Sequence, residues 1–215
     1  MENRKLCLHP LADRARRMPG TGALARLSRY NGGVSFMLRE FDPSDFEALW
    51  RIDQACFPPG ISYSRGELKT YMRRRGSFTL IAEERVEAGA EPAKRKKASA
   101  AIRLAASAAV GNSIAGFIVA EGGSRDSGHI ITIDVIAARR GAGLGSRLLE
   151  EAEARLLKAE CRAVQLETAV DNISALSFYK RHGYHVIETF PRYYANGVDA
   201  LVLKKDLAEV PENFR

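Results

Sequence analysis

The stretch DVIAARRGAGLGSRLL, residues 134–149, joins an apolar run to a leucine-spaced helix pattern through a loop rich in glycine. Gly141, Gly143 and Gly145 leave three backbone amides of this loop without a flanking side chain. The first N–H groups of a helix have no partner within the helix, and the helix dipole places partial positive charge at that end. The stretch therefore predicts a site where a phosphate or diphosphate approaches the backbone.

Three phosphate-binding motifs compete for this loop. A P-loop ends in Gly-Lys-Ser/Thr, whereas here Ser146 follows Gly145 without the lysine. The dinucleotide fingerprint requires the spacing GxGxxG inside an early strand-helix-strand unit, and the spacing here is GxGxG. The pattern Arg/Gln-x-x-Gly-x-Gly/Ala fits RGAGLG at Arg140, Gly143 and Gly145. A glycine loop that only turns tightly is the structural alternative.

Composition and charge indicate one globular domain. Of the 215 residues, 46% are hydrophobic, which is enough for a sizeable core. The formal net charge is +7, but residues 1–35 hold seven basic and two acidic residues, so only +2 remains for the other 180 residues. Because the rest of the chain is nearly neutral, we do not expect nucleic acid as a partner.

Cysteine and histidine spacing predicts no metal site. The three cysteines, Cys7, Cys56 and Cys161, lie far apart, and none belongs to a CxxC or Cys/His ligand pattern. This usage favours a reduced, cytoplasmic protein without structural metal. No window of 18 apolar residues is present, so we expect no membrane span. The basic N-terminus also lacks the apolar segment of a secretory signal.

Changes in composition suggest where the domain begins and ends. Residues 1–36 form a basic leader that we expect to be disordered, with Met37 as a plausible start of the domain. The domain is predicted over residues 37–207, and residues 208–215 form a tail. The link between two of the predicted strands, at about residues 86–110, is rich in alanine and basic side chains. It is far longer than the usual 2–5 residues of a hairpin, so we interpret it as an insertion.

Hydrophobic periodicity predicts an α/β domain with the order βααββ followed by βαβαββ. The strand over 129–136 is almost wholly apolar, and we expect it to be central and buried on both faces. The other predicted strands are 35–41, 77–84, 113–121, 163–170, 184–190 and 199–207. The predicted helices are 42–56, 64–76, 145–160 and 172–183.

Four segments carry a family resemblance: LWRIDQACF, TIDVIAARRGAGLG, LETAVDNISALSFYKRHGY and RYYANGVDALVL. In this order and spacing the chain resembles the GNAT acetyltransferase superfamily, and within it the RimI-like N-terminal acetyltransferases of ribosomal proteins. The resemblance covers residues 37–207 apart from the insertion. It implies a GNAT fold, with a central mixed twisted sheet, flanking helices, and acetyl-CoA in a V-shaped splay between the two central strands.

The resemblance implies acetyl-CoA as co-substrate and no metal. Backbone groups of Ile133 and Val135 would pair with the pantetheine arm like an extra strand, and Asn172 would touch the same region. Asp134 is counted with the cofactor site, where it either faces the acceptor amine or is a charge satisfied by a neighbour. The residues that would cradle the diphosphate are Arg140, Gly141, Ala142, Gly143, Leu144, Gly145 and Ser146.

The resemblance also implies two catalytic residues, Glu167 as the base and Tyr179 as the general acid beside the thioester sulfur. A carboxylate, directly or through a water, can take the proton from an α-amine with a pKa near ~8, and a phenol can protonate a leaving thiolate with a pKa of about 8.5. The structural alternatives are an outward-facing strand residue for Glu167, a ring packed on the sheet for Tyr179, and a helix cap for Asn172, which is compatible with its other role.

The acceptor is expected to be the N-terminal α-amine of a peptide or protein. The resemblance implies that the loop from Phe57 to Ser64, which includes Tyr63, helps to build the acceptor site, and that the pair Tyr193 and Tyr194 lies where the family shapes its peptide-binding cleft. In FPPGISYS the residues after Phe57 depart from the Phe-Pro-Trp-like segment of RimI-like enzymes. A lysine or a small-molecule amine as acceptor, and an acyl-CoA-binding module without catalysis, are the alternatives.

Overall fold

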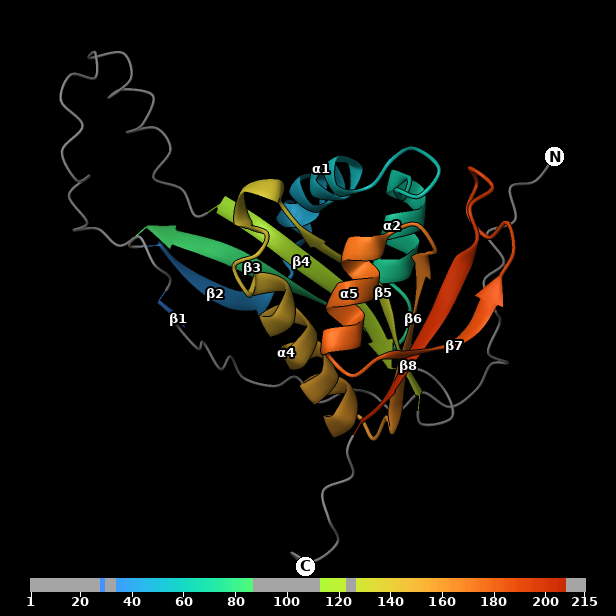
Figure 1. Ribbon diagram of the computed structural model, residues 1–215. Helices are drawn as coiled ribbons and strands as arrows, with labels where there is room; N and C mark the ends of the chain where they lie inside the picture. The colour runs from blue at the N-terminus through green and yellow to red at the C-terminus, as the bar shows by residue number, and fades with distance from the viewer. Residues whose placement is uncertain (1–27, 30–33, 87–112, 123–126, 208–215) are drawn as a thin grey trace, which may run out of the picture.

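The fold is a mixed sheet with helices on both faces, shown by a computed structural model that describes residues 28–29, 34–86, 113–122 and 127–207 (Figure 1). The sheet has the strand order β1-β2-β3-β4-β5-β6-β8-β7. Its strands are β1 (Ser28–Arg29), β2 (Val34–Glu40), β3 (Ser77–Val86), β4 (Ser113–Gly122), β5 (Ser127–Val135), β6 (Ala163–Ala169), β7 (His185–Phe190) and β8 (Ala200–Asp206). The helices are η1 (Pro43–Asp45), α1 (Phe46–Cys56), α2 (Arg65–Met72), η2 (Ala137–Arg139), α4 (Leu144–Lys158) and α5 (Ile173–Arg181).

Each strand and helix predicted within these residues is present in the predicted order. Ser64 and Glu67 form a capping box, since each side chain bonds the backbone N–H of the other residue at the start of α2. Helices α4 and α5 pack on one face of the sheet, and α1 and α2 pack on the other (Figure 1). None of the helices within the described ranges is long and apolar enough to cross a membrane.

The central strands β5 and β6 separate shortly after they meet. Their parallel pairing is limited to three residue pairs, from Ser127 with Ala163 to His129 with Gln165. Beyond this point β5 continues along β4 to Val135, while β6 continues along β8 to Ala169. The predicted V-shaped splay is therefore present, and its apex lies at His129.

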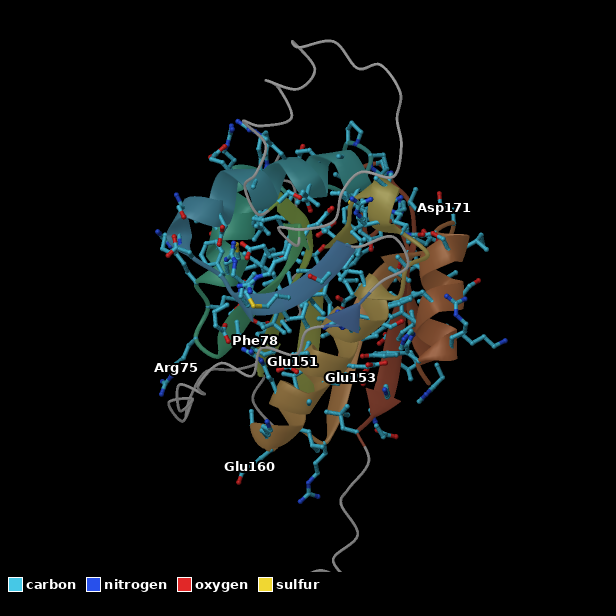
Figure 2. The ribbon with its side chains drawn as sticks, turned by 90° about the vertical axis from the view of Figure 1, so that its left-hand side faces the viewer. Arg75, Phe78, Glu151, Glu153, Glu160 and Asp171 are labelled. Carbon is cyan, nitrogen blue, oxygen red and sulfur yellow. The ribbon has the colours of Figure 1, made fainter. Side chains whose placement is uncertain are left out.

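Helix α4 is held to the sheet on two sides. On one side Arg155, which also bonds Glu151 of the same helix at 3.2 Å, lies 5.6 Å from the centre of the Phe78 ring on β3; Phe78 and Glu151 are labelled in Figure 2. On the other side Glu153 accepts hydrogen bonds from Lys205 at 2.6 Å and from Tyr184 at 3.0 Å. The helix that carries the glycine loop is thus tied to β3 and β8.

Two expectations about strands need correction. Strand β5 is not buried on both faces, because its side chains alternate between buried and half-buried, as expected when one face borders an opening. The domain begins before its predicted start at Met37, because β2 begins at Val34 and Phe36 is only 3% exposed. Residues 1–27 of the predicted leader, the insertion from 87 onward and the tail 208–215 lie outside the described residues.

The side chain of Asp134 lies beneath α1, close to a second buried carboxyl, that of Asp53. Asp134 accepts a hydrogen bond from the hydroxyl of Thr132 at 2.9 Å, and Asp53 accepts one from the backbone N–H of Tyr63 at 2.9 Å. Burial, and then the charge of Asp53, raise the pKa of Asp134 to about 8. Asp134 is therefore a neutral acid near pH 7, and it is not among the residues that line the cleft described below, so its place at the cofactor site stays a prediction. Side chains alternate along β5, so those of Ile133 and Val135 lie on the opposite face.

We predict that the substitution Asp134→Asn changes the pH dependence of stability. Between the ordinary pKa of 3.8 and the folded-state value of about 8, the folded chain binds more protons at Asp134 than the unfolded chain. The free energy of unfolding therefore falls as pH rises through this window, by up to ~1.4 kcal/mol per pH unit, and the asparagine variant lacks this loss.

Urea denaturation of both proteins at a series of pH values measures the effect. Asp171→Asn makes the same chemical change at an exposed position at the start of α5 and serves as the control (Figure 2). If the difference between wild type and Asp134→Asn is constant across the window, Asp134 is ionised in the folded protein and the assignment of a neutral acid is wrong.

Candidate active site

A cleft of about 790 Å³ opens where β5 and β6 separate. The glycine loop and the N-terminus of α4 form one end of it, and the loops that follow α1 and β7 form the other. Predicted site residues that line the cleft are Phe57, Tyr63, Ile133, Val135, Arg140, Gly141, Gly143, Leu144, Gly145, Ser146, Glu167, Asn172, Tyr179 and Tyr194. Most of the positions proposed from the sequence are therefore brought together.

The glycine loop has the geometry of an anion cradle. Gly141 and Gly143 have φ angles of +74° and +75°, in the left-handed region that glycine adopts without strain. A Cβ built on either residue would meet nothing within 4 Å, so the space beside the backbone is open. Gly145 allows close packing instead, since its Cβ would lie 3.5 Å from the Phe178 ring. The first N–H groups of α4 have no partners within the helix, so this open space has the character of an anion-binding site.

The edge of β5 inside the splay presents backbone groups. Amides and carbonyls alternate in direction along an antiparallel strand, and the N–H of Ile136 bonds Ala115 on β4. The backbone N–H and C=O groups of residues 131, 133 and 135 therefore point into the opening between β5 and β6. The carbonyl of Ile131 accepts from the Tyr63 hydroxyl at 3.2 Å, and that of Val135 accepts from Arg140 Nε at 2.9 Å. Between them, the N–H and C=O of Ile133 are placed to pair with an extended ligand.

Glu167 is held by a histidine that the sequence analysis missed. Its Oε2 lies 2.7 Å from His129 Nε2, and Nδ1 of the same ring lies 3.8 Å from Glu121 Oε1. Burial opposes the charge on His129, but the carboxylates of Glu121 and Glu167 beside its two ring nitrogens outweigh burial and raise the pKa of His129 from 6.5 to about 9. Near neutral pH a histidine cation therefore sits between two carboxylates at the apex of the splay.

Tyr179 combines a packed ring with a position at the cleft. The residue is 6% exposed, and its ring makes edge contacts with Phe178 at 5.2 Å and Tyr184 at 5.4 Å between centroids. Burial, and secondarily the carboxylate that Asp134 becomes above about pH 8, raise the pKa of Tyr179 well above its ordinary value. The phenol therefore keeps its proton at physiological pH, as a general acid requires.

The opposite end of the cleft is lined by aromatic and apolar side chains. The residues that contribute to this end are Phe57, Pro58, Ile61, Tyr63 and Tyr194. The loops that carry them meet, because the N–H of Ala195 bonds the carbonyl of Gly60 at 3.2 Å. At Gly60, which has φ of +88°, a Cβ would lie 3.1 Å from the backbone of Asn196, so glycine permits this contact.

Three predicted residues lie outside the cleft lining: Ala142, Asp134 and Tyr193. Tyr193 instead stacks on Phe190, with 6.1 Å between ring centroids, so only Tyr194 of the pair faces the cleft. Asn172 caps α5 by accepting from the N–H of Ala175 at 3.2 Å, which confirms the cap, and its role toward pantetheine stays a prediction. The residues that line the cleft also include Cys56, Phe178 and Arg181. The sequence did not indicate a role for them at the site, because each falls in a pattern typical of helices.

Comparison with known proteins gives one family. The profile of the Acetyltransferase (GNAT) family matches residues 46–184. An uncharacterized N-acetyltransferase of Methanocaldococcus jannaschii is 38% identical over 95 residues, which are 43% of this chain and 59% of the relative. The N-alpha-acetyltransferase daf-31 of Caenorhabditis elegans is 30% identical over 105 residues, 46% of this chain and 58% of the relative. The chain thus spans little more than half the length of these relatives.

Solved structures share the fold over most of the chain. The ribosomal-protein-S18-alanine N-acetyltransferase of Escherichia coli aligns with a TM-score of 0.60 and 17% identity, covering 84% of this chain and 99% of that one. Naa50 of Arabidopsis thaliana, in complex with the bisubstrate analogue CoA-Ac-MVNAL, aligns with a TM-score of 0.59 and 21% identity, covering 81% and 99%. At these identities the likeness concerns the fold.

We predict that Gly143→Asp weakens CoA binding by about tenfold or more relative to Gly143→Asn. Both residues tolerate the left-handed conformation that Gly143 adopts, and they have nearly the same shape, so they differ in charge. The aspartate places its carboxylate in the open space that the diphosphate would fill. Isothermal calorimetry measures the two affinities, and circular dichroism checks the fold; equal affinities would place the diphosphate elsewhere.

Proposed function

Since the chain belongs to the Acetyltransferase (GNAT) family, we propose that it is an acyltransferase that moves the acetyl group of acetyl-CoA to the α-amino group of a peptide or protein N-terminus. One observation carries this proposal: Glu167, bonded to His129, and the neutral phenol of Tyr179 line the same cleft between its diphosphate end and its apolar end. This is the order in which cofactor, reacting groups and acceptor have to follow one another.

Each end of the cleft has a separate task. Arg140 to Ser146 and the N-terminus of α4 would hold the diphosphate, and the backbone of Ile133 would pair with the pantetheine arm. Acetyl-CoA supplies a thioester whose carbonyl an amine can attack directly, so no covalent enzyme intermediate is required. Holding both reactants in one cleft supplies much of the rate by proximity.

The proton steps are assigned to Glu167 and Tyr179. The carboxylate of Glu167 takes a proton from the acceptor ammonium, directly or through a water, and the nitrogen lone pair then attacks the thioester carbon. As the carbon–sulfur bond breaks, Tyr179 gives its proton to the leaving thiolate, and the second proton that the nitrogen loses as it becomes an amide restores the phenol. His129 is a positioning residue in this scheme, because its cation holds Oε2 of Glu167 at 2.7 Å.

The apolar end of the cleft favours, as the acceptor, the α-amine of a peptide whose first side chain is uncharged. Among the described residues that line the cleft, the acidic ones are Glu167 and Asp171 alone, so a polyamine or aminoglycoside would find few counter-charges. An α-amine, with a pKa near ~8, also loses its proton more readily than a lysine at ~10.4. The relatives named as N-alpha-acetyltransferases and the neighbour bound to CoA-Ac-MVNAL support the same acceptor class. The cytoplasmic location stays a prediction.

The acceptor class is tested by acetylation of a peptide library, read by mass spectrometry. Each peptide is paired with a copy whose N-terminus is formylated and whose internal lysine is intact. We expect acetylation of free N-termini, strongest for apolar first residues, and none of the formylated copies. Acetylation of lysine in the blocked copies, or of small amines alone, would contradict the proposed acceptor.

We predict that Tyr179→Phe lowers kcat by roughly 10²–10⁴-fold while the KM for acetyl-CoA changes little, because proton donation acts in the transition state. Tyr184→Phe is a matched control, since that ring packs on Tyr179 but its hydroxyl bonds Glu153. A Tyr179→Phe enzyme within a few-fold of wild type would assign the phenol to packing.

We predict a different pH signature for Glu167→Gln. Its defect should be largest near neutral pH and should shrink toward about pH 9.5, where the α-amine is deprotonated without help. Initial rates with one peptide across this range measure it. A defect that stays constant with pH would make Glu167 a substrate-positioning residue instead of the base.

A further inference from the structure

His182 connects the end of α5 to the beginning of α4. Its Nδ1 lies 2.8 Å from the carbonyl oxygen of Phe178, and its Nε2 lies 2.9 Å from the hydroxyl of Ser146. Ser146 is in the first turn of α4 and lines the cleft beside Gly143 and Gly145. One imidazole therefore links a helix end to the loop that would hold the diphosphate.

The helix end fixes which ring nitrogen carries the proton. The carbonyl of Phe178 can only accept, so Nδ1 must donate to it. This carbonyl belongs to the last turn of α5, where the backbone N–H of His182 bonds Tyr179 instead. In the neutral ring, Nε2 then has no proton and accepts, so the hydroxyl of Ser146 donates to it.

This arrangement conflicts with a bound anion. A serine hydroxyl has one proton, and while that proton is given to His182 the oxygen of Ser146 presents only lone pairs to the cleft. Lone pairs repel the oxygens of a diphosphate. The conflict disappears if Nε2 becomes protonated, because the imidazolium then donates to Ser146 Oγ and the hydroxyl proton can turn toward the anion.

We propose that His182 is a positioning residue of the diphosphate site, and that CoA binds together with a proton on His182 that turns the Ser146 hydroxyl toward the diphosphate. The inference rests on the proposed binding of acetyl-CoA at the glycine loop. It goes beyond that function because it makes the affinity for CoA depend on pH through a residue outside the cleft lining.

The surrounding charges favour coupling to the anion. The charged residues on elements packed around His182 are Arg147, Glu150 and Glu153 on α4, Lys180 and Arg181 on α5, and Lys205 on β8. Of the acidic ones, Glu153 already bonds Lys205 at 2.6 Å. A diphosphate bound at the N-terminus of α4 would add negative charge beside Ser146, which favours a proton on the imidazole that bonds it.

Calorimetry with dephospho-CoA on the full chain tests the proposal. This probe lacks the 3′-phosphate, whose own titration near pH ~6 would otherwise add protons. Binding is measured at pH 7.5 in three buffers, PIPES, HEPES and Tris. The slope of the observed binding enthalpy against the ionisation enthalpy of the buffer gives the number of protons taken up on binding. We expect an uptake approaching one proton, and a dissociation constant that rises by up to about tenfold per pH unit above neutrality.

Three variants assign that proton. His182→Gln should lose the uptake and the steep pH dependence, and Ser146→Ala should lose them as well while keeping the imidazole. His185→Gln, an equal change at an exposed position on β7, should keep both. Binding without proton uptake, or unchanged uptake in His182→Gln, would overturn the inference and leave the proposed function intact. Failure of the unsubstituted chain to bind dephospho-CoA would contradict both.

Discussion

The limited pairing of β5 with β6 is the constraint on which the rest of the structure depends. The two strands share three residue pairs and then follow different neighbours, β4 and β8. Backbone groups left without partners inside a protein are costly, and Tyr63 and Arg140 satisfy two carbonyls of the exposed β5 edge. At Ile133 the edge remains open, so the fold itself creates a place for an extended polar ligand.

The electrostatics of the site follow from what surrounds this opening. At the apex His129 carries positive charge because two carboxylates outweigh its burial. Deeper in the sheet burial keeps Asp134 protonated at neutral pH and also keeps the proton on Tyr179. The site therefore contains a carboxylate held by a cation and a phenol that keeps its proton, which are the two states that a proton acceptor and a proton donor need.

Much of this architecture could be predicted from the sequence because its signals are local. The glycines before α4, the capping box at Ser64 and the helical spacing of leucines each depend on neighbours along the chain. Other features depend on contacts between distant segments. The role of His129 requires Glu121 and Glu167 to lie beside it, and the sequence offers no spacing that shows this. Likewise, whether Tyr193 or Tyr194 faces the cleft is decided by stacking on Phe190.

We propose that the open edge of β5 binds CoA as an added strand. Amide hydrogen exchange measured by NMR, with and without saturating CoA, tests it most directly. The amide of Asp134 points to β4 and is an internal reference, while that of Ile133 points into the opening. The account predicts that CoA slows exchange at Ile133 by about tenfold or more and leaves Asp134 unchanged. Exchange at Ile133 that is unaffected by bound CoA would contradict it.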